Sequence, residues 1–175
     1  FISLLLLSIF TITLINGLFL EKYYVSKKVE VLEEAKEVLS QMNLDDILQY
    51  DTDTAEDQKE AADEIPDEIE RSSSRNNLTW IIVNEENSGY YYWGENNMAK
   101  MLRSKLFGYV NNLDQDMQRS RVLKKTDTCT MWQVHDRFAG MEYVECWGQF
   151  DNGYYFLIRS PLESIKESAA ISNSF

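Results

Sequence analysis

Hydrophobic residues are concentrated at the start of the chain, where positions 1–20 carry no charged side chain and are rich in Leu, Ile and Phe. An α-helix rises about 1.5 Å per residue, so a helix over this segment would measure about 30 Å, which is the thickness of the hydrocarbon core of a bilayer. The residues that follow are polar and strongly acidic. The pattern therefore predicts a transmembrane helix over 1–20 and a lipid bilayer as its partner.

A cleaved signal peptide is the alternative interpretation of this segment. Signal peptides have a shorter apolar region, a basic start and a small-x-small cleavage site. Positions 16–21 read Asn-Gly-Leu-Phe-Leu-Glu, without an Ala-x-Ala pattern. The length and the flanks therefore favour an uncleaved anchor.

A helical pattern continues beyond the apolar segment. Val25, Leu32 and Leu39 recur at seven-residue intervals, with Ala35 and Met42 between them and Lys or Glu at many other positions. This spacing predicts a membrane-proximal helix over 21–48. Packing on the chain's own sheet is the commoner role for such a stripe, and a parallel helix pair in a homodimer is the functional alternative.

The next stretch is acidic, and Lys59 is its only base between positions 51 and 70. A calcium-binding EF-hand loop starting at Asp51 would need Gly at its sixth position and Glu at its twelfth. Those positions hold Glu56 and Ala62. We therefore expect a solvated acidic helix or loop and no metal site.

From position 78 the pattern changes to short β-branched and aromatic runs separated by turn residues. These runs predict strands over 78–83, 90–93, 129–136, 142–150 and 154–160, with a helix over about 98–109 after the second strand. The fold class expected is α+β, with an antiparallel sheet flanked by helices in one sensor domain over 49–160.

The last two strands are joined by Asp151, Asn152 and Gly153, which tolerate the positive φ of a tight hairpin. A two-residue Asn152-Gly153 loop would pair Phe150 with Tyr155. Both faces of this hairpin are then largely apolar, so both must be covered. The N-terminal helix can cover one face, and the second helix, loops or a ligand can cover the other.

The last strand leads into a capping signal. Ser160, Pro161 and Glu163 fit the N-cap, N1 and N3 positions of a helix, and they predict an exit helix over 161–175 that starts where the strand stops. A strand that runs directly into a helix transmits displacement. We therefore assign signal coupling to these three residues.

Charge and cysteine content narrow the function further. The formal net charge of −12 argues against nucleic acid as a partner, because a phosphate backbone needs Lys and Arg to replace its counterions. Cys129 and Cys146 are the only cysteines, and the hairpin between them brings them near one another. A disulfide and two buried thiols both fit this arrangement.

No catalytic constellation is visible. His135 has no positioned partner in the sequence, and Gly89 and Gly94 stand alone instead of forming a phosphate-binding loop. We therefore expect neither catalytic residues nor a cofactor in this chain. The candidates for ligand contact are aromatic and basic strand residues, a type that more often belongs to the core: Tyr91, Tyr92, Trp93, Trp132, Tyr155 and Arg159.

One segment resembles a known family. Trp147-Gly148, Asp151-Asn152-Gly153 and the run 157–165, with Ile171-Ser172-Asn173 beyond it, resemble the end of the extracytoplasmic sensor region of clostridial-type sensor histidine kinases. The order of elements upstream resembles PAS-like or Cache sensor folds. The resemblance implies that the domain after residue 20 lies outside the cytoplasm. It also implies a second transmembrane span and a HAMP linker beyond the exit helix, then a cytoplasmic kinase core that acts on a response regulator.

We therefore expect the input domain of a two-component sensor histidine kinase, acting as a homodimer on an unknown small molecule, peptide or ion. The full-length parent would then be a histidine protein kinase. A membrane-anchored binding module without kinase output is the alternative, as is the ectodomain of a chemoreceptor or cyclase receptor. The sequence after position 175 distinguishes them, because a second apolar span supports a receptor.

Overall fold

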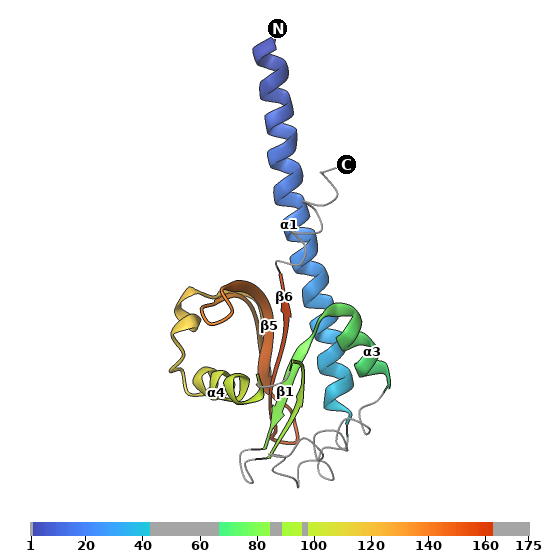
Figure 1. Ribbon diagram of the computed structural model, residues 1–175, viewed down its shortest axis with the longest axis vertical. Helices are drawn as coiled ribbons and strands as arrows, with labels where there is room; N and C mark the ends of the chain where they lie inside the picture. The colour runs from blue at the N-terminus through green and yellow to red at the C-terminus, as the bar shows by residue number, and fades with distance from the viewer. Residues whose placement is uncertain (1, 43–66, 85–88, 96–97, 163–175) are drawn as a thin grey trace.

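The computed structural model describes residues 2–42, 67–84, 89–95 and 98–162 (Figure 1). The helices are α1 (Ile2–Ser40), α3 (Asp67–Asn76), α4 (Ala99–Val110) and the 3-10 helix η1 (Gln115–Arg119). The strands are β1 (Thr79–Val83), β2 (Tyr90–Trp93), β3 (Arg121–Lys125), β4 (Cys129–Asp136), β5 (Met141–Gln149) and β6 (Tyr155–Pro161). The acidic positions considered for calcium, 51–62, lie outside the described residues.

The six strands form one sheet in the order β2-β1-β6-β5-β4-β3, with every neighbouring pair antiparallel. This arrangement confirms the α+β class. Five strands match the predicted runs. The sixth, β3, was not predicted, because its sequence Arg-Val-Leu-Lys-Lys lies exposed at the sheet edge and lacks a buried alternating pattern.

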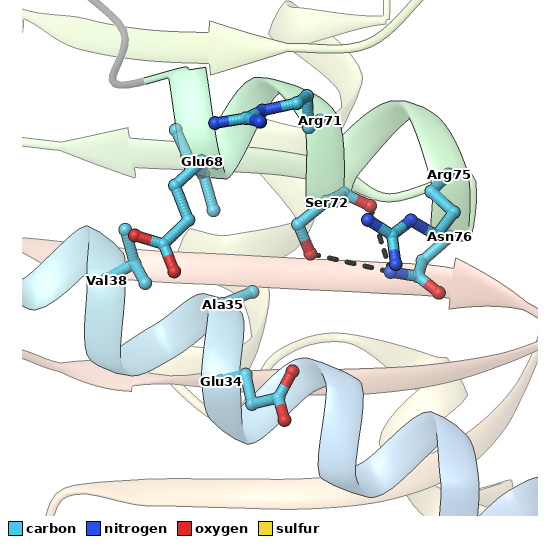
Figure 2. Close-up of a pocket in the computed structure, with 9 residues that line it drawn as sticks. Glu34, Ala35, Val38, Glu68, Arg71, Ser72, Arg75 and Asn76 are labelled. Atoms are coloured by element: carbon cyan, nitrogen blue, oxygen red, sulfur yellow. Dashed lines mark hydrogen bonds between the residues drawn. The ribbon is translucent and has the colours of Figure 1, made fainter.

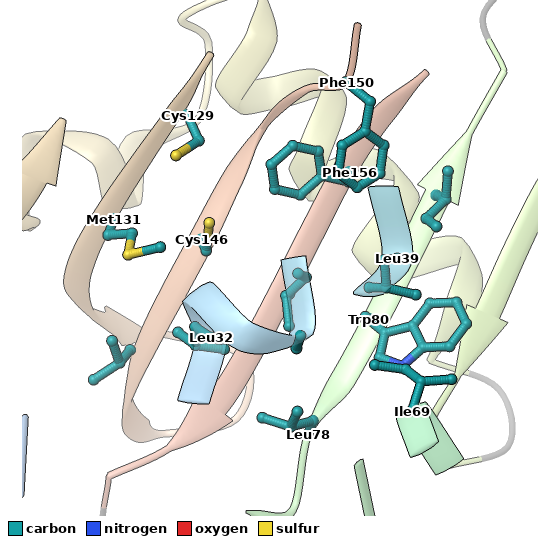
Figure 3. Packing of buried hydrophobic residues seen from close by; sticks show 14 of the residues in the cluster. Leu32, Leu39, Ile69, Leu78, Trp80, Cys129, Met131, Cys146, Phe150 and Phe156 are labelled. Carbon is teal, nitrogen blue, oxygen red and sulfur yellow. The ribbon is translucent and has the colours of Figure 1, made fainter. Parts of the chain in front are cut away.

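Helix α1 is continuous from the apolar segment into the domain core (Figure 1). Its first half is long and apolar enough to span a membrane, and none of its most apolar window is buried. Its second half buries Leu32, Ala35 and Leu39 in a core with Ile69 of α3 and Trp80 of β1 (Figure 3). The seven-residue stripe therefore packs on the chain's own sheet, which is the commoner of the two roles expected for it.

The opposite face of the sheet is covered by α4. Leu102, Leu106 and Tyr109 of this helix pack with Ile81 of β1 and Leu157 of β6. Figure 1 shows α1 and α3 on one side of the sheet and α4 on the other. The expectation that both apolar faces need covering is confirmed.

The predicted register of the last hairpin is wrong by one residue. Gln149, not Phe150, is opposite Tyr155. The loop has three residues instead of two, because Phe150 pairs with Tyr154 and Gly153 takes a positive φ of 90° after a turn closed by its N–H on Phe150 O at 2.9 Å. A shift of one residue exchanges which side chains share a face, so Phe150 stacks on Phe156 with ring centroids 4.2 Å apart.

The helix cap predicted at Ser160 is also wrong. Ser160 and Pro161 belong to β6, where Pro161 is opposite Tyr143, and the Leu162 N–H donates to Glu142 O at 2.8 Å. Strand pairing continues because β5 is long enough to supply partners there. Glu163 and the predicted exit helix lie outside the described residues.

Candidate functional site

Five charged side chains are buried between the sheet and α4, and we call them the buried ionic cluster. Asp136 and Glu145 are fully buried, and Arg159 is 2% exposed. Lys105 of α4 and Asp116 of η1 complete the group at 6% and 5% exposure. Strand alternation directs the members on β4, β5 and β6 toward the α4 face. Carrying this many charges inside a small core is costly unless they are paired.

The cluster is a chain of ion pairs. Lys105 Nζ lies 2.9 Å from Asp116 Oδ2 and 3.5 Å from Asp136 Oδ2. Arg159 Nη1 lies 2.6 Å from Asp136 Oδ2 and 3.8 Å from Glu145 Oε1. At the outer end, the half-exposed Arg137 contacts Asp116 Oδ1 through Nε at 2.8 Å. This series of ion pairs therefore leads from the surface at Arg137 to the buried Glu145.

Glu145 is only partly satisfied. Its Oε2 accepts hydrogen bonds from the Tyr109 hydroxyl at 2.7 Å and from Trp132 Nε1 at 3.0 Å. Among the described residues, Glu145 Oε1 and Arg159 Nε have no hydrogen-bond partner. The Arg159 guanidinium lies over the Tyr143 ring, 4.0 Å from its centroid. An incompletely bonded buried network is sensitive to any change in charge or position.

The three carboxyl groups of the buried ionic cluster have pKa values shifted in different directions. Burial raises the pKa of Glu145, although Lys105 and the two hydrogen bonds oppose that effect. For Asp136, burial alone would raise the pKa, but backbone N–H donation from Ala139 and the Arg159 contact hold it below its usual value. Burial alone would also raise the pKa of Asp116, but its contacts with Arg137 and Lys105 hold that pKa below its usual value. The pKa values of Asp136 and Asp116 are thus lowered, whereas that of Glu145 is raised.

Lys105 keeps its proton. Burial alone would lower its pKa, but Glu145, Asp116 and Asp136 together raise it. When Glu145 is protonated, the cations Lys105, Arg137 and Arg159 outnumber the two aspartates. The net charge of the buried ionic cluster therefore depends on the protonation of Glu145.

The residues predicted to contact a ligand do not form one site. Trp132, Tyr155 and Arg159 lie on the α4 face with Tyr92, whereas Tyr91 and Trp93 belong to the α1 face. Tyr91 stacks on Trp80 with ring centroids 5.7 Å apart. Two of the six, Trp132 and Arg159, belong to or contact the buried ionic cluster. Strand alternation made it impossible for three consecutive residues, 91–93, to face one cavity.

The sequence reasoning missed Lys105, Asp116, Asp136 and Glu145. A signal for Glu145 was present, because it interrupts an apolar strand between Val144 and Cys146, where a charged residue is seldom left unpaired. His135 is half-exposed, with Nδ1 3.4 Å from Glu142 Oε1. It contacts none of the cluster carboxylates.

The surface of the described part of the molecule has hollows on both sides of the sheet region, and two of them are defined by their lining residues. One, of about 400 Å³, lies between α1 and α3 and is lined by charged and small residues including Glu34, Glu68 and Arg71 (Figure 2). The other, of about 420 Å³, lies beside the β3–β4 turn and includes Trp147 and Tyr155. Of the six predicted ligand residues, Tyr155 is the one that lines either of these two hollows.

A junction near the apolar half of α1 joins three elements. Ser160 Oγ of β6 accepts a hydrogen bond from Lys28 Nζ of α1 at 2.7 Å and donates to Asn76 O, at the end of α3, at 2.9 Å. Burial lowers the pKa of Lys28. Ser160 therefore contacts the helix that carries the apolar segment, through a different contact from the cap predicted for it.

Cys129 and Cys146 lie on the neighbouring strands β4 and β5, with free, buried thiols. Cys129 is opposite Gly148 and Cys146 is opposite Met131, so the cysteines are diagonal neighbours on one face. No group of three or more His, Cys, Asp or Glu side chains within the described ranges is placed to hold a metal ion.

Comparisons of the chain with protein-family models, with curated proteins and with solved structures gave no match.

Proposed function

We propose that this chain is the extracytoplasmic input domain of a two-component sensor histidine kinase, with a PAS-like or Cache-type fold, tethered to the cell membrane by α1. The observation that carries the proposal is the continuity of α1, whose apolar half leads without a break into the half that contributes Leu32 and Leu39 to the core. A stiff helix of this kind links the position of the sheet to the position of a membrane span.

Contacts along α1 support this coupling. Lys28 is bonded to Ser160 of the last strand, and farther from the membrane Glu33 is paired with Lys124 of β3. The two contacts attach α1 to both a central strand and an edge strand. A rearrangement of the sheet would therefore act on α1 at two positions along the helix, Lys28 and Glu33.

The ligand-dependent step is proposed for the α4 face. Its buried ionic cluster is held by several mutually dependent pairs, with Glu145 Oε1 and Arg159 Nε left without hydrogen-bond partners among the described residues. Ligand binding can shift the sheet only through different affinities for two states. A cluster whose hydrogen bonds are incomplete in the ligand-free state and complete in the bound state would supply such a difference in affinity.

The test uses membranes that contain the full-length parent protein. Transfer of phosphate from ATP to histidine is measured for the wild type, for Lys105→Met and for the exposed control Asp127→Asn. We expect ATP-dependent phosphorylation that changes in Lys105→Met and stays at the wild-type level in the control, with both variants folded by thermal melting. Absence of histidine phosphorylation in the parent would contradict the proposal and favour a chemoreceptor, a cyclase receptor or an anchored binding module.

A further inference from the structure

The two cysteines lie in contrasting surroundings on the α1 face of the sheet. Cys129 Sγ lies 3.8 Å from Lys36 Nζ of α1 and 3.3 Å from Thr126 Oγ1 of the preceding turn. Cys146 is fully buried one diagonal step away on β5. Figure 3 shows both sulfur atoms on the same side of the sheet. A cation and a hydroxyl thus converge on one sulfur, and the second thiol is next to it.

This environment separates the two thiols electrostatically. The hydrogen bond from Cys146, followed by Thr126 and Lys36, lowers the pKa of Cys129 to about 5 despite burial. The same contact with Cys129, together with burial, raises the pKa of Cys146 well above its usual value. The other charged groups nearby, Glu33 of α1 and Lys124 of β3, are paired with each other. At neutral pH the pair is therefore one thiolate and one thiol.

We propose that Cys129 and Cys146 are a reversible oxidation site, in which the Cys129 thiolate attacks a small hydroperoxide and Cys146 resolves the product to a disulfide. With hydrogen peroxide, the thiolate sulfur takes one oxygen as the O–O bond breaks, and the departing hydroxide takes up a proton to become water. Cys129 is then a sulfenic acid. Cys146 attacks its sulfur, an S–S bond forms, and a second water leaves.

Access limits the class of oxidant. Cys129 is 6% exposed and Cys146 is fully buried, so a hydroperoxide with one or a few heavy atoms fits better than a bulky disulfide. The thiolate character of Cys129 satisfies the other requirement for selective oxidation. This chemistry depends on Cys129, Cys146, Lys36 and Thr126 and does not rest on the proposed kinase function.

Oxidation has a consequence for α1. The disulfide carries no charge, so Lys36 loses the anion that it contacts on the sheet. Lys36 lies on the same helix as the apolar segment. The redox state of the pair is therefore communicated to the helix that leads toward the membrane.

The test uses the full chain in detergent micelles, treated with hydrogen peroxide over a pH series. We expect an intramolecular disulfide, seen by mass as loss of two hydrogen atoms and reversed by dithiothreitol, with a rate midpoint near the Cys129 pKa of about 5. An unperturbed cysteine would give a midpoint of about 8.5. In Cys146→Ser the sulfenic acid should accumulate and be trapped by dimedone.

Matched lysine variants separate this chemistry from a general effect of charge. Lys36→Met should move the rate midpoint upward, whereas Lys27→Met, which removes an exposed lysine paired with Glu30, should leave it unchanged. The proposal is overturned by a wild-type midpoint at the ordinary cysteine value or by equal midpoints in the two lysine variants. It is also overturned if both thiols of the folded chain persist in excess peroxide while those of the urea-unfolded chain are oxidised.

Discussion

Asp136 is the residue on which the buried ionic cluster depends most. Its Oδ2 accepts a hydrogen bond from the Arg159 guanidinium and forms an ion pair with Lys105. Its Oδ1 accepts hydrogen bonds from the backbone N–H groups of Phe138 and Ala139 at 2.9 and 3.1 Å. The same side chain therefore neutralises two buried cations and shapes the β4–β5 turn. Removing one partner of a buried ion pair costs more than the pair itself contributes, because it leaves a buried charge uncompensated.

We predict that Asp136→Asn lowers the free energy of unfolding by about 3–5 kcal/mol. The exposed turn residue Asp151 is the matched control, and Asp151→Asn should change stability by less than about 0.5 kcal/mol. Urea unfolding followed by tryptophan fluorescence measures both. Equal stabilities of the two variants would show that the Arg159 pair contributes little.

Glu145 gives the cluster a pH dependence of its own. Its folded-state pKa is raised by burial above the usual value of 4.5. As pH rises from there toward the folded-state pKa, the unfolded chain releases the proton and the folded chain retains it, so stability falls. We predict that Glu145→Gln lacks this fall, whereas the losses caused by Asp116 and Asp136 at lower pH remain. Unfolding free energies measured across the pH range should diverge above 4.5; parallel curves would contradict the assignment.

At the scale of elements, α1 is both an apolar helix and part of the core. Leu39, near its end, has no exposed surface and packs with Trp80 and Phe156 in the core on the α1 face. The heptad spacing of this stripe also suits a coiled coil, but the sheet already covers it. A homodimer, if formed, therefore has to use other surfaces.

We predict that Leu39→Ala lowers the free energy of unfolding by about 2–5 kcal/mol, as expected for a large-to-small change at a buried site. Its association state by sedimentation should match that of the wild type. Glu37→Ala, an exposed change on the same turn, should alter stability by less than about 0.5 kcal/mol. A variant of Leu39 that keeps its stability but loses association would assign the stripe to dimerisation.

Elements with strong periodicity were predictable, and register was not. The strand β4 and the helix α4 follow apolar patterns that the sequence displays directly. The β5–β6 hairpin shows the limit: Asn152 and Gly153 suit a two-residue loop, but Asn152 Oδ1 accepts the Tyr154 N–H at 3.1 Å and the loop widens to three residues. Local turn chemistry allowed both loops, and packing of Phe150 on Phe156 agrees with the wider one.

The candidate site was less predictable than the fold. Lys105, Asp116 and Glu145 come from three different elements, α4, η1 and β5, so only the folded structure reveals that they converge. The aromatic residues selected from the sequence have high β-propensity, and they pack in the hydrophobic cores on both faces of the sheet. Ser160 was singled out for the wrong contact: its hydroxyl bonds Lys28 and Asn76 instead of capping a helix.

As a whole, the molecule is an α+β domain on a long helix whose far half is apolar. The β5–β6 turn lies at the end of the domain away from the apolar half of α1 (Figure 1). Asp151 in that turn is exposed. A label placed there therefore reports the side of the membrane that the domain occupies.

The most direct test is labelling of Asp151→Cys, in a Cys129→Ser and Cys146→Ser background, with a membrane-impermeant maleimide in intact cells. We predict that intact cells give the same labelling as permeabilised cells, as expected for the extracytoplasmic domain that we propose. A cytoplasmic protein with an exposed cysteine, labelled only after permeabilisation, is the control. Labelling of Asp151→Cys only after permeabilisation would contradict the central claim.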